Sequence, residues 1–450
     1  MFGTEHRTPG DEPAVTGGPA TLLLDPRTGQ VRGMAPIGDE YAVSAAVAAA
    51  RDAAKTWSRL SGPDRAERLD ALAGHLEDRA DRYVELECAG TGKPDADARL
   101  EVAAGVRHLR SCAAVAGAPL PGSSAPLGVV GVLVHWAFPL LSALHQAGPA
   151  LVAGNAVVVK PAESTPDSVQ FLAESAVPVL GADVLGVVTG DRRTGRSLVA
   201  GQVDALSFAG NTGGAIDVAH RAGLRPAHLR WGGNSAAVVL PGAPGSTFRA
   251  LARARTHNAG QNFAPARVIT LRQNYEQVVH GLADAVAECR AGVDFGPLNN
   301  LDQLSLFDTA VATSDAGFCF EAETRLGPEE QHGFWRGARV LADLAPDAPA
   351  VLQEVPGPLL TVQAAPDPEA AARLAGSAAA AAHAASVWGP PEEAFEVAHL
   401  LRAKEISVNW VPGAAGALGG GGFPCRPEHL AAAVEDYRVK RTIWPLPPTG

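Results

Sequence analysis

The chain has few cysteines, few aromatic residues and no concentration of basic charge. Its five cysteines are scattered through 450 residues without CxxC spacing, a pattern that favours reduced thiols in the cytoplasm over a disulfide framework. The formal net charge of -11 and the lack of a basic run argue against a surface for nucleic acid or for an anionic membrane. The thirteen histidines have no metal-ligand spacing, so no metal site is expected.

The N-terminal segment lacks a long hydrophobic run. Residues 1–20 are polar and rich in Gly and Pro, which is not the pattern of a signal peptide or a membrane span. We expect a disordered tail there.

The remaining composition is that of a large globular protein. A hydrophobic fraction of 46% over 450 residues is enough for two or three domains with a sizeable core. Short β-branched runs alternate with alanine-rich helical stretches, which is typical of a parallel sheet covered by helices. The predicted strands are 128–134, 156–159, 184–189, 205–209, 236–240 and 268–271.

Two helices are predicted from the N-terminal part of the chain. A Pro/Gly turn at residues 25–30 sits within an expected strand pair, and a helix should follow from Asp39. Leucines recur at helical spacing between charged residues over 65–87, which predicts one amphipathic helix that ends before Gly90.

Several segments, read in order, resemble the aldehyde dehydrogenase superfamily. They are 25–30 (DPRTGQ), 92–94 (GKP), 128–139 (GVVGVLVHWAFP), 154–166 (GNAVVVKPAESTP), 207–214 (SFAGNTGG), 229–235 (LRWGGNS), 353–360 (QEVPGPLL), 407–410 (SVNW) and 436–440 (DYRVK). Each is weak alone, but their common order identifies the chain as a divergent member of that superfamily.

The resemblance implies an α/β architecture with a Rossmann-type domain and a second α/β domain of the catalytic type. The expected division is 1–20 as the tail, 21–232 as the dinucleotide-binding domain, 233–412 as the catalytic-type domain, and 413–450 as the C-terminal return with an oligomerisation strand. The protruding hairpin that the family uses in assembly is shortened near 117–127. An exposed C-terminal strand at 438–444 would seek a partner edge, so we expect association with a cysteine-bearing relative or with itself.

The resemblance assigns a dinucleotide site to retained residues. Lys160 and Glu163 match the residues that bind the adenosine ribose, and a carboxylate at that place favours NAD over NADP. Gly210 and Asn211 belong to the glycine turn that carries the pyrophosphate, where helix N–H groups attract anions.

The nicotinamide end is less well matched. Glu354 corresponds to the residue that holds the nicotinamide ribose, and Trp136 lies in the cofactor-contacting W-A-F-P segment. The family usually has an aromatic residue two places after this glutamate, and here that position is Pro356. We therefore expect NAD, or NADP, with the adenosine half better specified.

The side chains that carry family catalysis are replaced. In residues 258–267 (NAGQNFAPAR), which resemble the nucleophile loop, the thiol position is Phe263, or Asn262 if one residue is deleted. The oxyanion asparagine is Ala137 and the general-base glutamate is Arg230. A guanidinium stays protonated and cannot act as that base, so thioester-forming chemistry is not expected.

Some residues could supply other chemistry. Cys425 lies where the family chain returns near the cleft, and His135 and His257 flank the altered positions; for each, a structural role competes with a catalytic one. Arg230 reverses the charge of the old base and would favour an anionic ligand, with Arg267 adding to it, unless Arg230 pairs with Glu354 or turns to solvent.

Three functions stay open from the sequence. The first is a non-catalytic partner or ligand-binding subunit that binds NAD(P). The second is an NAD(P)-dependent oxidoreductase or a non-redox enzyme that uses the cleft without a covalent intermediate, on an anionic substrate among others. The third is ordinary aldehyde oxidation through Cys425.

Overall fold

The computed structural model describes residues 18–116, 124–377, 384–403, 405–411 and 427–441. An antiparallel ribbon of β1 (Ala20–Leu24) and β2 (Val31–Pro36) opens this part of the chain. Helix α1 (Glu40–Trp57) follows, and the Asp39 carboxylate caps its N-terminus by accepting from the Ala42 N–H. The expected strand pair and helix are confirmed.

The first sheet has five parallel strands in the order β6-β5-β4-β7-β8. Their bounds are β4 (Val129–Leu133), β5 (Ala156–Lys160), β6 (Leu185–Val187), β7 (Ala205–Gly210) and β8 (Ala227–Trp231). Four of these strands correspond to predicted β-branched runs. Each of those four is largely apolar, as expected for strands buried on both faces.

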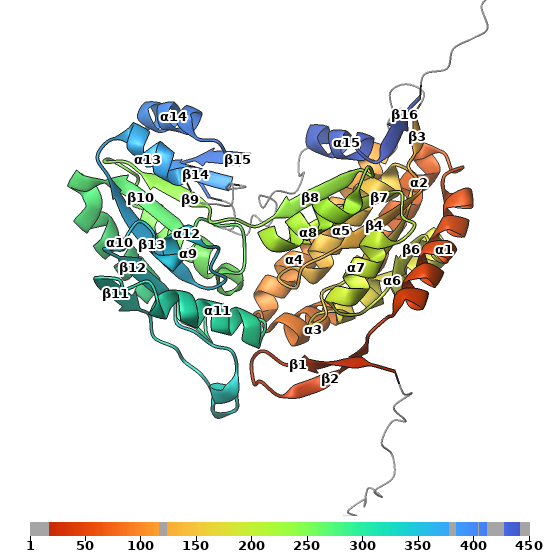
Figure 1. The fold of residues 1–450 in the computed structure, drawn as a ribbon, viewed down its shortest axis with the longest axis horizontal. Coiled ribbons are helices and arrows are strands. Elements are labelled where there is room, and N and C mark those ends of the chain that lie inside the picture. Colours follow the sequence, from red (N-terminus) through yellow and green to blue (C-terminus); the bar gives the residue numbers. More distant parts are fainter. Residues whose placement is uncertain (1–17, 117–123, 378–383, 404, 412–426, 442–450) are drawn as a thin grey trace, which may run out of the picture.

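Helices cover both faces of this sheet (Figure 1). One core contains residues of α2 (Gly62–Asp78), α4 (Asp95–Ala116), α5 (Pro139–Val152) and α6 (Asp167–Leu180). The other face packs against α1, α7 (Arg192–Ala200) and α8 (Thr212–Ala222). This is the doubly covered arrangement of a Rossmann-type unit.

The single helix predicted over residues 65–87 is wrong. The chain forms α2 and then α3 (Ala80–Thr91), with Arg79 between them at φ −112° and ψ 19°. The leucine spacing continues across the break, because both helices bury an apolar face, so periodicity alone could not locate it.

The second sheet has seven strands in the order β11-β12-β13-β10-β9-β14-β15, all parallel except the β11–β12 pair. The strands are β9 (Ala236–Val239), β10 (Arg267–Leu271), β11 (Phe318–Glu321), β12 (Arg339–Ala342), β13 (Leu359–Ala365), β14 (Ala384–Trp388) and β15 (Glu405–Val408). One face packs on α9 (Thr247–Thr256), α10 (Tyr275–Ala287), α11 (Leu301–Ala312) and α12 (Pro349–Leu352), and the other on α13 (Pro368–Ala375) and α14 (Pro391–Leu400).

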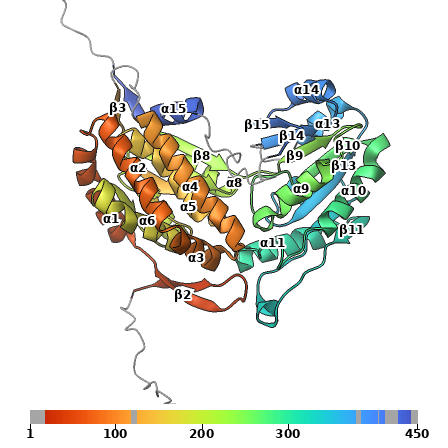
Figure 2. The same cartoon turned by 180° about the vertical axis from the view of Figure 1, so that it is seen from behind.

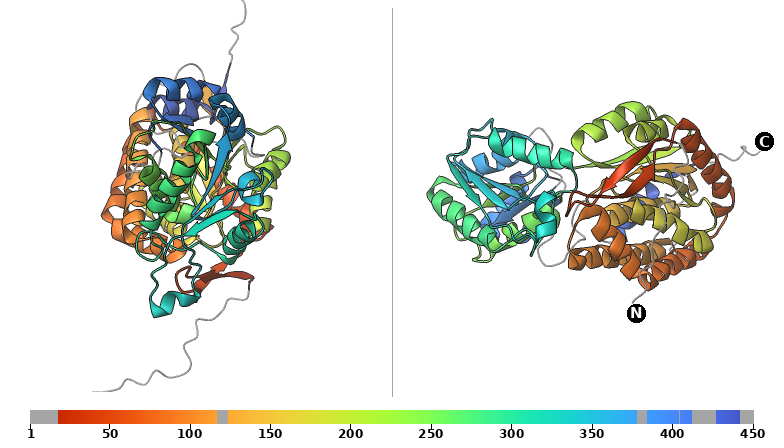
Figure 3. Two further views of the ribbon diagram at one scale, coloured as in Figure 1. Left: turned by 90° about the vertical axis from the view of Figure 1, so that its left-hand side faces the viewer. Right: turned by 90° about the horizontal axis from the view of Figure 1, so that it is seen from below.

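The two sheets form two lobes, and in the view of Figure 1 the ribbon of β1 and β2 lies below the first lobe, with its turn hydrogen-bonded to the second lobe through Phe334 and Trp335. Figures 2 and 3 show the same lobes from behind, from one side and from below. The expected boundary at 232/233 falls between β8 and β9. The α/β class with a Rossmann-type sheet and a second α/β unit is confirmed.

The C-terminal part of the chain returns to the first lobe. Helix α15 (Pro427–Glu435) packs near α4 and α5, and β16 (Arg438–Lys440) pairs with β3 (Ser124–Pro126). The expected C-terminal strand thus has a partner within its own chain. The tail at 1–17, the hairpin residues 117–123 and residues 442–444 of that strand lie outside the described residues. Among the described helices, none is long and apolar enough to cross a membrane.

Candidate functional site

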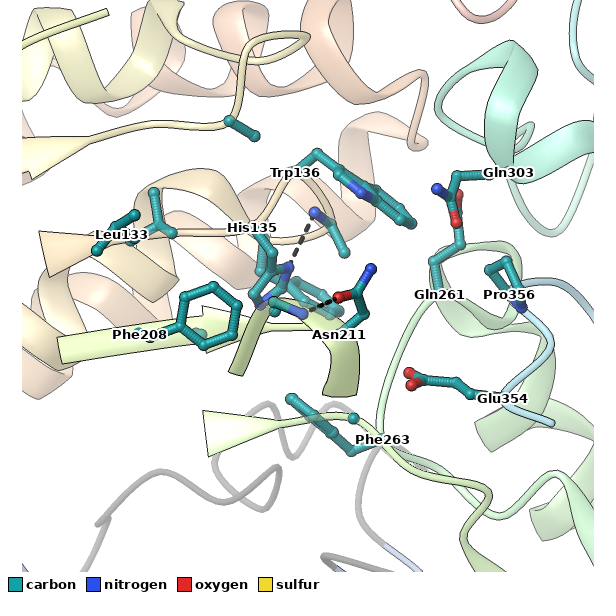
Figure 4. A pocket seen from close by; sticks show the side chains of 18 of the residues that line it. Leu133, His135, Trp136, Phe208, Asn211, Gln261, Phe263, Gln303, Glu354 and Pro356 are labelled. Atoms are coloured by element: carbon teal, nitrogen blue, oxygen red, sulfur yellow. Dashed lines mark hydrogen bonds between the residues drawn. The ribbon is translucent and has the colours of Figure 1, made fainter. Parts of the chain in front are cut away.

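A cavity of about 420 Å³ is lined by residues of both lobes. It lies beyond the C-terminal ends of β4, β5 and β7, where ligands bind in open α/β sheets. The structure brings together there eight residues that the resemblance assigned to cofactor or catalytic positions: Trp136, Ala137, Lys160, Glu163, Gly210, Asn211, Phe263 and Glu354. Figure 4 shows Trp136 on one side of this space and Gln303, Glu354 and Pro356 on the other.

Lys160 and Glu163 form one end of the cavity. Lys160 ends β5 and is 9% exposed, and burial lowers its pKa to about 8 although Glu163 and Asp191 oppose the shift. An ammonium and a carboxylate within one turn of chain can bind neighbouring hydroxyl groups.

The start of α8 forms the middle of the cavity. Asn211 caps this helix by accepting from the Gly214 N–H at 2.7 Å. The Phe208 ring lies against Gly210 and Gly214, because a Cβ at either glycine would meet its Cζ at 2.4 Å or 2.6 Å. The helix start is therefore held by its own cap and faces the cavity, where its N–H groups favour an anion.

Glu354 lies at the opposite end, close to the backbone of Gly232. A Cβ added to Gly232 would stand 1.9 Å from Glu354 Oε1, so a side chain at this position would displace the carboxylate from where it lies. Burial raises the pKa of Glu354, and Arg255 opposes the rise. Arg255 also lines the cavity, and burial lowers its pKa to about 10.

The 258–267 loop turns sharply before β10. Asn258 and Ala259 have left-handed backbone angles, with φ of 50° and 52°. Asn262 Nδ2 donates to the carbonyls of Ala254 and His257 at 2.9 Å and 2.7 Å, and its Oδ1 accepts from the Ala264 N–H. The Asn262 amide thus holds the loop, while Phe263 contributes to the cavity wall.

Ala137 is fixed through its backbone. Its carbonyl accepts from Asn258 Nδ2 at 2.9 Å and from Lys93 Nζ at 3.1 Å, and its N–H donates to His135 Nδ1 at 3.1 Å. The side chain presents only a methyl group, so it supplies no donor for an oxyanion.

Of the alternatives left open for Arg230, a place in the wall of the dinucleotide cavity is not what the structure shows. Arg230 is on β8 but is not among the residues that line the cavity. Its neighbour Leu229 packs toward α1, α7 and α8, so Arg230 turns to the other face of the sheet. There its charge lowers the pKa of His108 on α4 and of His145 on α5, although burial is the larger cause for both.

Arg267 also does not add charge to the cavity. It is 1% exposed and donates to the carbonyls of Asn234, Leu374 and Ala375 at 3.1, 3.0 and 2.9 Å. Its role is therefore to bond backbone carbonyls within the second lobe.

The two flanking histidines differ. His135 lines the cavity; burial lowers its pKa to about 4, and its Nε2 has no hydrogen-bond partner among the described residues. Because Nδ1 accepts the Ala137 N–H, the neutral ring carries its proton on Nε2. His257 lies outside the cavity lining, stacks on Phe138, and has Nδ1 3.6 Å from Asp97 Oδ2.

No cysteine of the described residues lines this cavity. Cys112 is buried near His108, and burial raises the pKa of its thiol. Cys425 lies outside the described residues. In the described part of the chain, no group of three or more His, Cys, Asp or Glu is placed to hold a metal ion.

Arg255 and Gln303 also line the cavity, but the sequence did not predict either of them as a site residue. Arg255 lies in the last turn of α9, just before the 258–267 loop, and Gln303 is on α11. Neither residue stood in a segment with a recognisable pattern, so only the packing of the second lobe identifies them.

A family model described as the aldehyde dehydrogenase family matches residues 18–423. A 2-aminomuconic 6-semialdehyde dehydrogenase of Pseudomonas sp. is 29% identical over 425 residues, with 86% of each chain covered. A 2-hydroxymuconic semialdehyde dehydrogenase of Pseudomonas sp. (strain CF600) is 30% identical over 426 residues, covering 86% of this chain and 87% of the relative.

The crystal structure of a Mycobacterium tuberculosis aldehyde dehydrogenase complexed with NAD+ is similar to this fold, with a TM-score of 0.85 and 25% identity over 97% of this chain and 96% of that one. The order of motifs, the two sheets and the site between them agree with these matches. The chain belongs to the aldehyde dehydrogenase family.

Proposed function

We propose that this chain binds NAD or NADP in the cavity between its lobes and does not form a thioester, acting as a ligand-binding subunit or partner. The donor set fits a dinucleotide. Lys160 and Glu163 would hold the adenosine ribose, the start of α8 the pyrophosphate, and Glu354 the second ribose. The M. tuberculosis relative is described as complexed with NAD+.

The Glu163 carboxylate favours NAD over NADP. A carboxylate accepts hydrogen bonds from free ribose hydroxyls and repels a 2′-phosphate. Arg192, Arg196 and Arg221 also line this end, but Asp217 pairs with Arg196 at 3.0 Å and with Arg221 at 2.8 Å. Cationic side chains still outnumber Glu163 and Asp217 in the lining of this end, so the preference for NAD rests on the Glu163 carboxylate alone.

The observation that carries the loss of thioester chemistry is the wall at the other end of the cavity. A phenyl group at Phe263 and a methyl group at Ala137 occupy the surface where a nucleophile and an oxyanion donor would be needed. The Asn262 amide is engaged with backbone groups. A bound nicotinamide ring could accept hydride, but these residues provide no nucleophile that could form a covalent bond with an aldehyde.

Calorimetric titration with NAD+, NADH, NADP+ and NADPH tests this function. We expect binding, with NAD+ or NADH preferred over the phosphorylated forms. Failure of all four to bind would remove the proposal. An aldehyde panel with NAD+ should give no NADH at rates typical of the family, and turnover that disappears in Cys425→Ser would establish ordinary aldehyde oxidation instead.

A second function, NAD(P)-linked interconversion of a hydroxyl and a carbonyl group, is favoured by His135. Its neutral ring lines the cavity and carries the proton on Nε2, and a neutral imidazole can donate to a carbonyl oxygen. Nε2 itself is buried, so this role requires a movement of the ring or its neighbours when substrate binds. Clear discrimination between NAD+ and NADH, with NADH consumption by an aldehyde or ketone that is lost in His135→Phe, would support this enzyme. No turnover with either class of substrate would leave the binding subunit.

An anionic ligand remains part of the proposal. Two relatives are named for muconic semialdehydes, which are acidic molecules, and Arg230, although it does not line the dinucleotide cavity, is the residue that reverses the charge of the general-base position. Malonate or phosphate should then raise the melting temperature, and Arg230→Ala should remove the increase. Equal protection of both proteins would exclude Arg230 as the receptor.

We also propose association with a cysteine-bearing member of the family, or with a second copy. The two-stranded sheet of β3 and β16 is short, and strands of this kind leave edges that can pair further. Light scattering, alone and with such a relative, tests it; a pure monomer that binds no relative would be the contrary result.

A further inference from the structure

Arg255 is a buried cation in the wall of the dinucleotide cavity. It is 4% exposed and lies in the last turn of α9. Its Nε donates to the Leu359 carbonyl at 3.0 Å and its Nη2 to the Val355 carbonyl at 2.8 Å. The two acceptors flank residues 356–358, so one guanidinium clamps both sides of the turn that follows Glu354.

The turn has little freedom around this clamp. A Cβ at Gly260 would meet the Gly357 carbonyl oxygen at 2.0 Å, and one at Gly357 would meet the Phe307 ring at 2.1 Å. The turn is therefore packed between the 258–267 loop and α11. Glu354 begins this segment and reaches across to Gly232 on the opposite wall.

Arg255 also acts on the charge of Glu354. Burial favours the neutral carboxylic acid, and the nearby guanidinium favours the carboxylate. Burial does not deprotonate Arg255 itself at neutral pH. An ionised carboxylate accepts hydrogen bonds from hydroxyl groups more strongly than a neutral acid does.

We propose that Arg255 is a positioning residue that keeps Glu354 aimed into the cavity and ionised, so that Glu354 can accept the hydroxyls of the ribose next to nicotinamide. This inference rests on the proposed binding of a dinucleotide. A purely structural role would be different, because Arg255 would then stabilise the second lobe without selecting the part of the ligand that is bound.

Fragments of the ligand separate the two roles. AMP reaches only the end formed by Lys160 and Glu163, whereas NAD+ extends to Glu354. Loss of the clamp should weaken NAD+ binding about tenfold, which corresponds to about 1.4 kcal/mol. Binding of AMP should stay within twofold, because the first lobe is unchanged.

The variants are Arg255→Leu, Arg255→Lys and Arg253→Leu, titrated calorimetrically with NAD+ and with AMP. Arg253 is an exposed arginine on the same helix, so Arg253→Leu makes the same change of charge without breaking the clamp and should match the wild type. Arg255→Lys keeps the charge but cannot span both carbonyls, so its affinity for NAD+ should fall between wild type and Arg255→Leu.

A double-mutant cycle with Glu354→Gln completes the test. If Arg255 acts through Glu354, adding Arg255→Leu or Arg255→Lys to Glu354→Gln should cause little further loss of NAD+ affinity. Additive losses, equal losses for AMP and NAD+, or wild-type affinity in Arg255→Leu would each overturn the inference. If wild type binds neither AMP nor NAD+, the proposed function itself fails. If Arg255→Leu does not fold, the affinities of Arg255→Lys for NAD+ and AMP are compared with those of the wild type instead.

Discussion

Replacing Lys93 with methionine should destabilise the first lobe strongly and in a pH-dependent way. The ammonium of Lys93 is 1% exposed and lies between Glu101, with which it makes a short contact, and Glu87, whose Oε2 is 3.5 Å away. Both carboxylates are fully buried. Burial alone would lower the pKa of Lys93, but the two glutamates raise it above its usual value.

The size of this destabilisation follows from the buried negative charge that the substitution leaves without a partner. Burial and Glu87 raise the pKa of Glu101 to about 8 despite the attraction of Lys93, so one carboxyl group already holds a proton near pH 7. Without Lys93 the other carboxylate is left buried beside Glu101 with no cation. Removing one partner of a buried ion pair typically costs roughly 3–5 kcal/mol, because it leaves an uncompensated buried charge.

The loss of stability in Lys93→Met should increase as the pH rises. A carboxyl group whose pKa is raised on folding contributes stability that is present below its unfolded pKa and is lost as the pH rises through its folded pKa. The deficit of Lys93→Met relative to wild type should therefore be about 3 kcal/mol at pH 7 and below about 1 kcal/mol at pH 5.

Urea unfolding followed by circular dichroism at pH 5, 6, 7 and 8 measures this deficit. The control is Lys55→Met, which removes a lysine paired with Asp52 at the surface, where both side chains are more than two-thirds exposed; it should not change the urea midpoint measurably. A Lys93→Met deficit below 1 kcal/mol at pH 7, or one that is the same at pH 5 and pH 8, would refute the reasoning.

Three further predictions concern other buried groups. Burial lowers the pKa of Lys160 to about 8, so the ammonium loses its charge as the pH rises through 8. The calorimetric affinity for NAD+ should therefore fall about tenfold between pH 7 and pH 9. The Lys160→Arg variant should bind NAD+ equally at both pH values. Arg267→Leu should lower the free energy of unfolding by about 3 kcal/mol, measured with urea, because two buried carbonyls and one part-buried carbonyl lose their donor. A thiol reagent at pH 8 should modify the exposed Cys319 in the native protein but should modify Cys112, whose pKa is raised by burial, only after unfolding.

The fold could be predicted largely from runs of residues that do not depend on long-range packing. The strands β4, β5, β7, β9 and β10 coincide with β-branched runs, since a strand buried on both faces must be apolar throughout. The motifs around Lys160 and Asn211 follow the ends of such strands, so their convergence in one cavity was predictable.

Packing details could not be predicted in the same way. The side chains alternate along β8, but the sequence does not show which of its two faces meets the cavity. Whether Arg230 enters the cavity was therefore left open, and it lies on the other face. Arg255 is on a helix with two other arginines nearby, and only the position of β13 and its preceding turn distinguishes it. The break at Arg79 is a local change of backbone angle without a glycine or proline to mark it.

On the proposed function, binding and covalent chemistry depend on separate sets of atoms in this site. The adenosine end is formed by a strand end and a helix start whose geometry is held by the chain's own bonds, such as the Asn211 cap. At the other end, the amides of Asn258 and Asn262 are engaged with backbone carbonyls, and what faces the ligand beside them is the phenyl group of Phe263 and the methyl group of Ala137. Because the adenosine-binding side chains and the replaced side chains at Phe263 and Ala137 stand on different segments of the chain, replacing the reactive side chains need not have disturbed the adenosine site. The chain can thus keep its affinity for a dinucleotide without forming a thioester. Glu354, held by Arg255, then determines how tightly the nicotinamide ribose is bound.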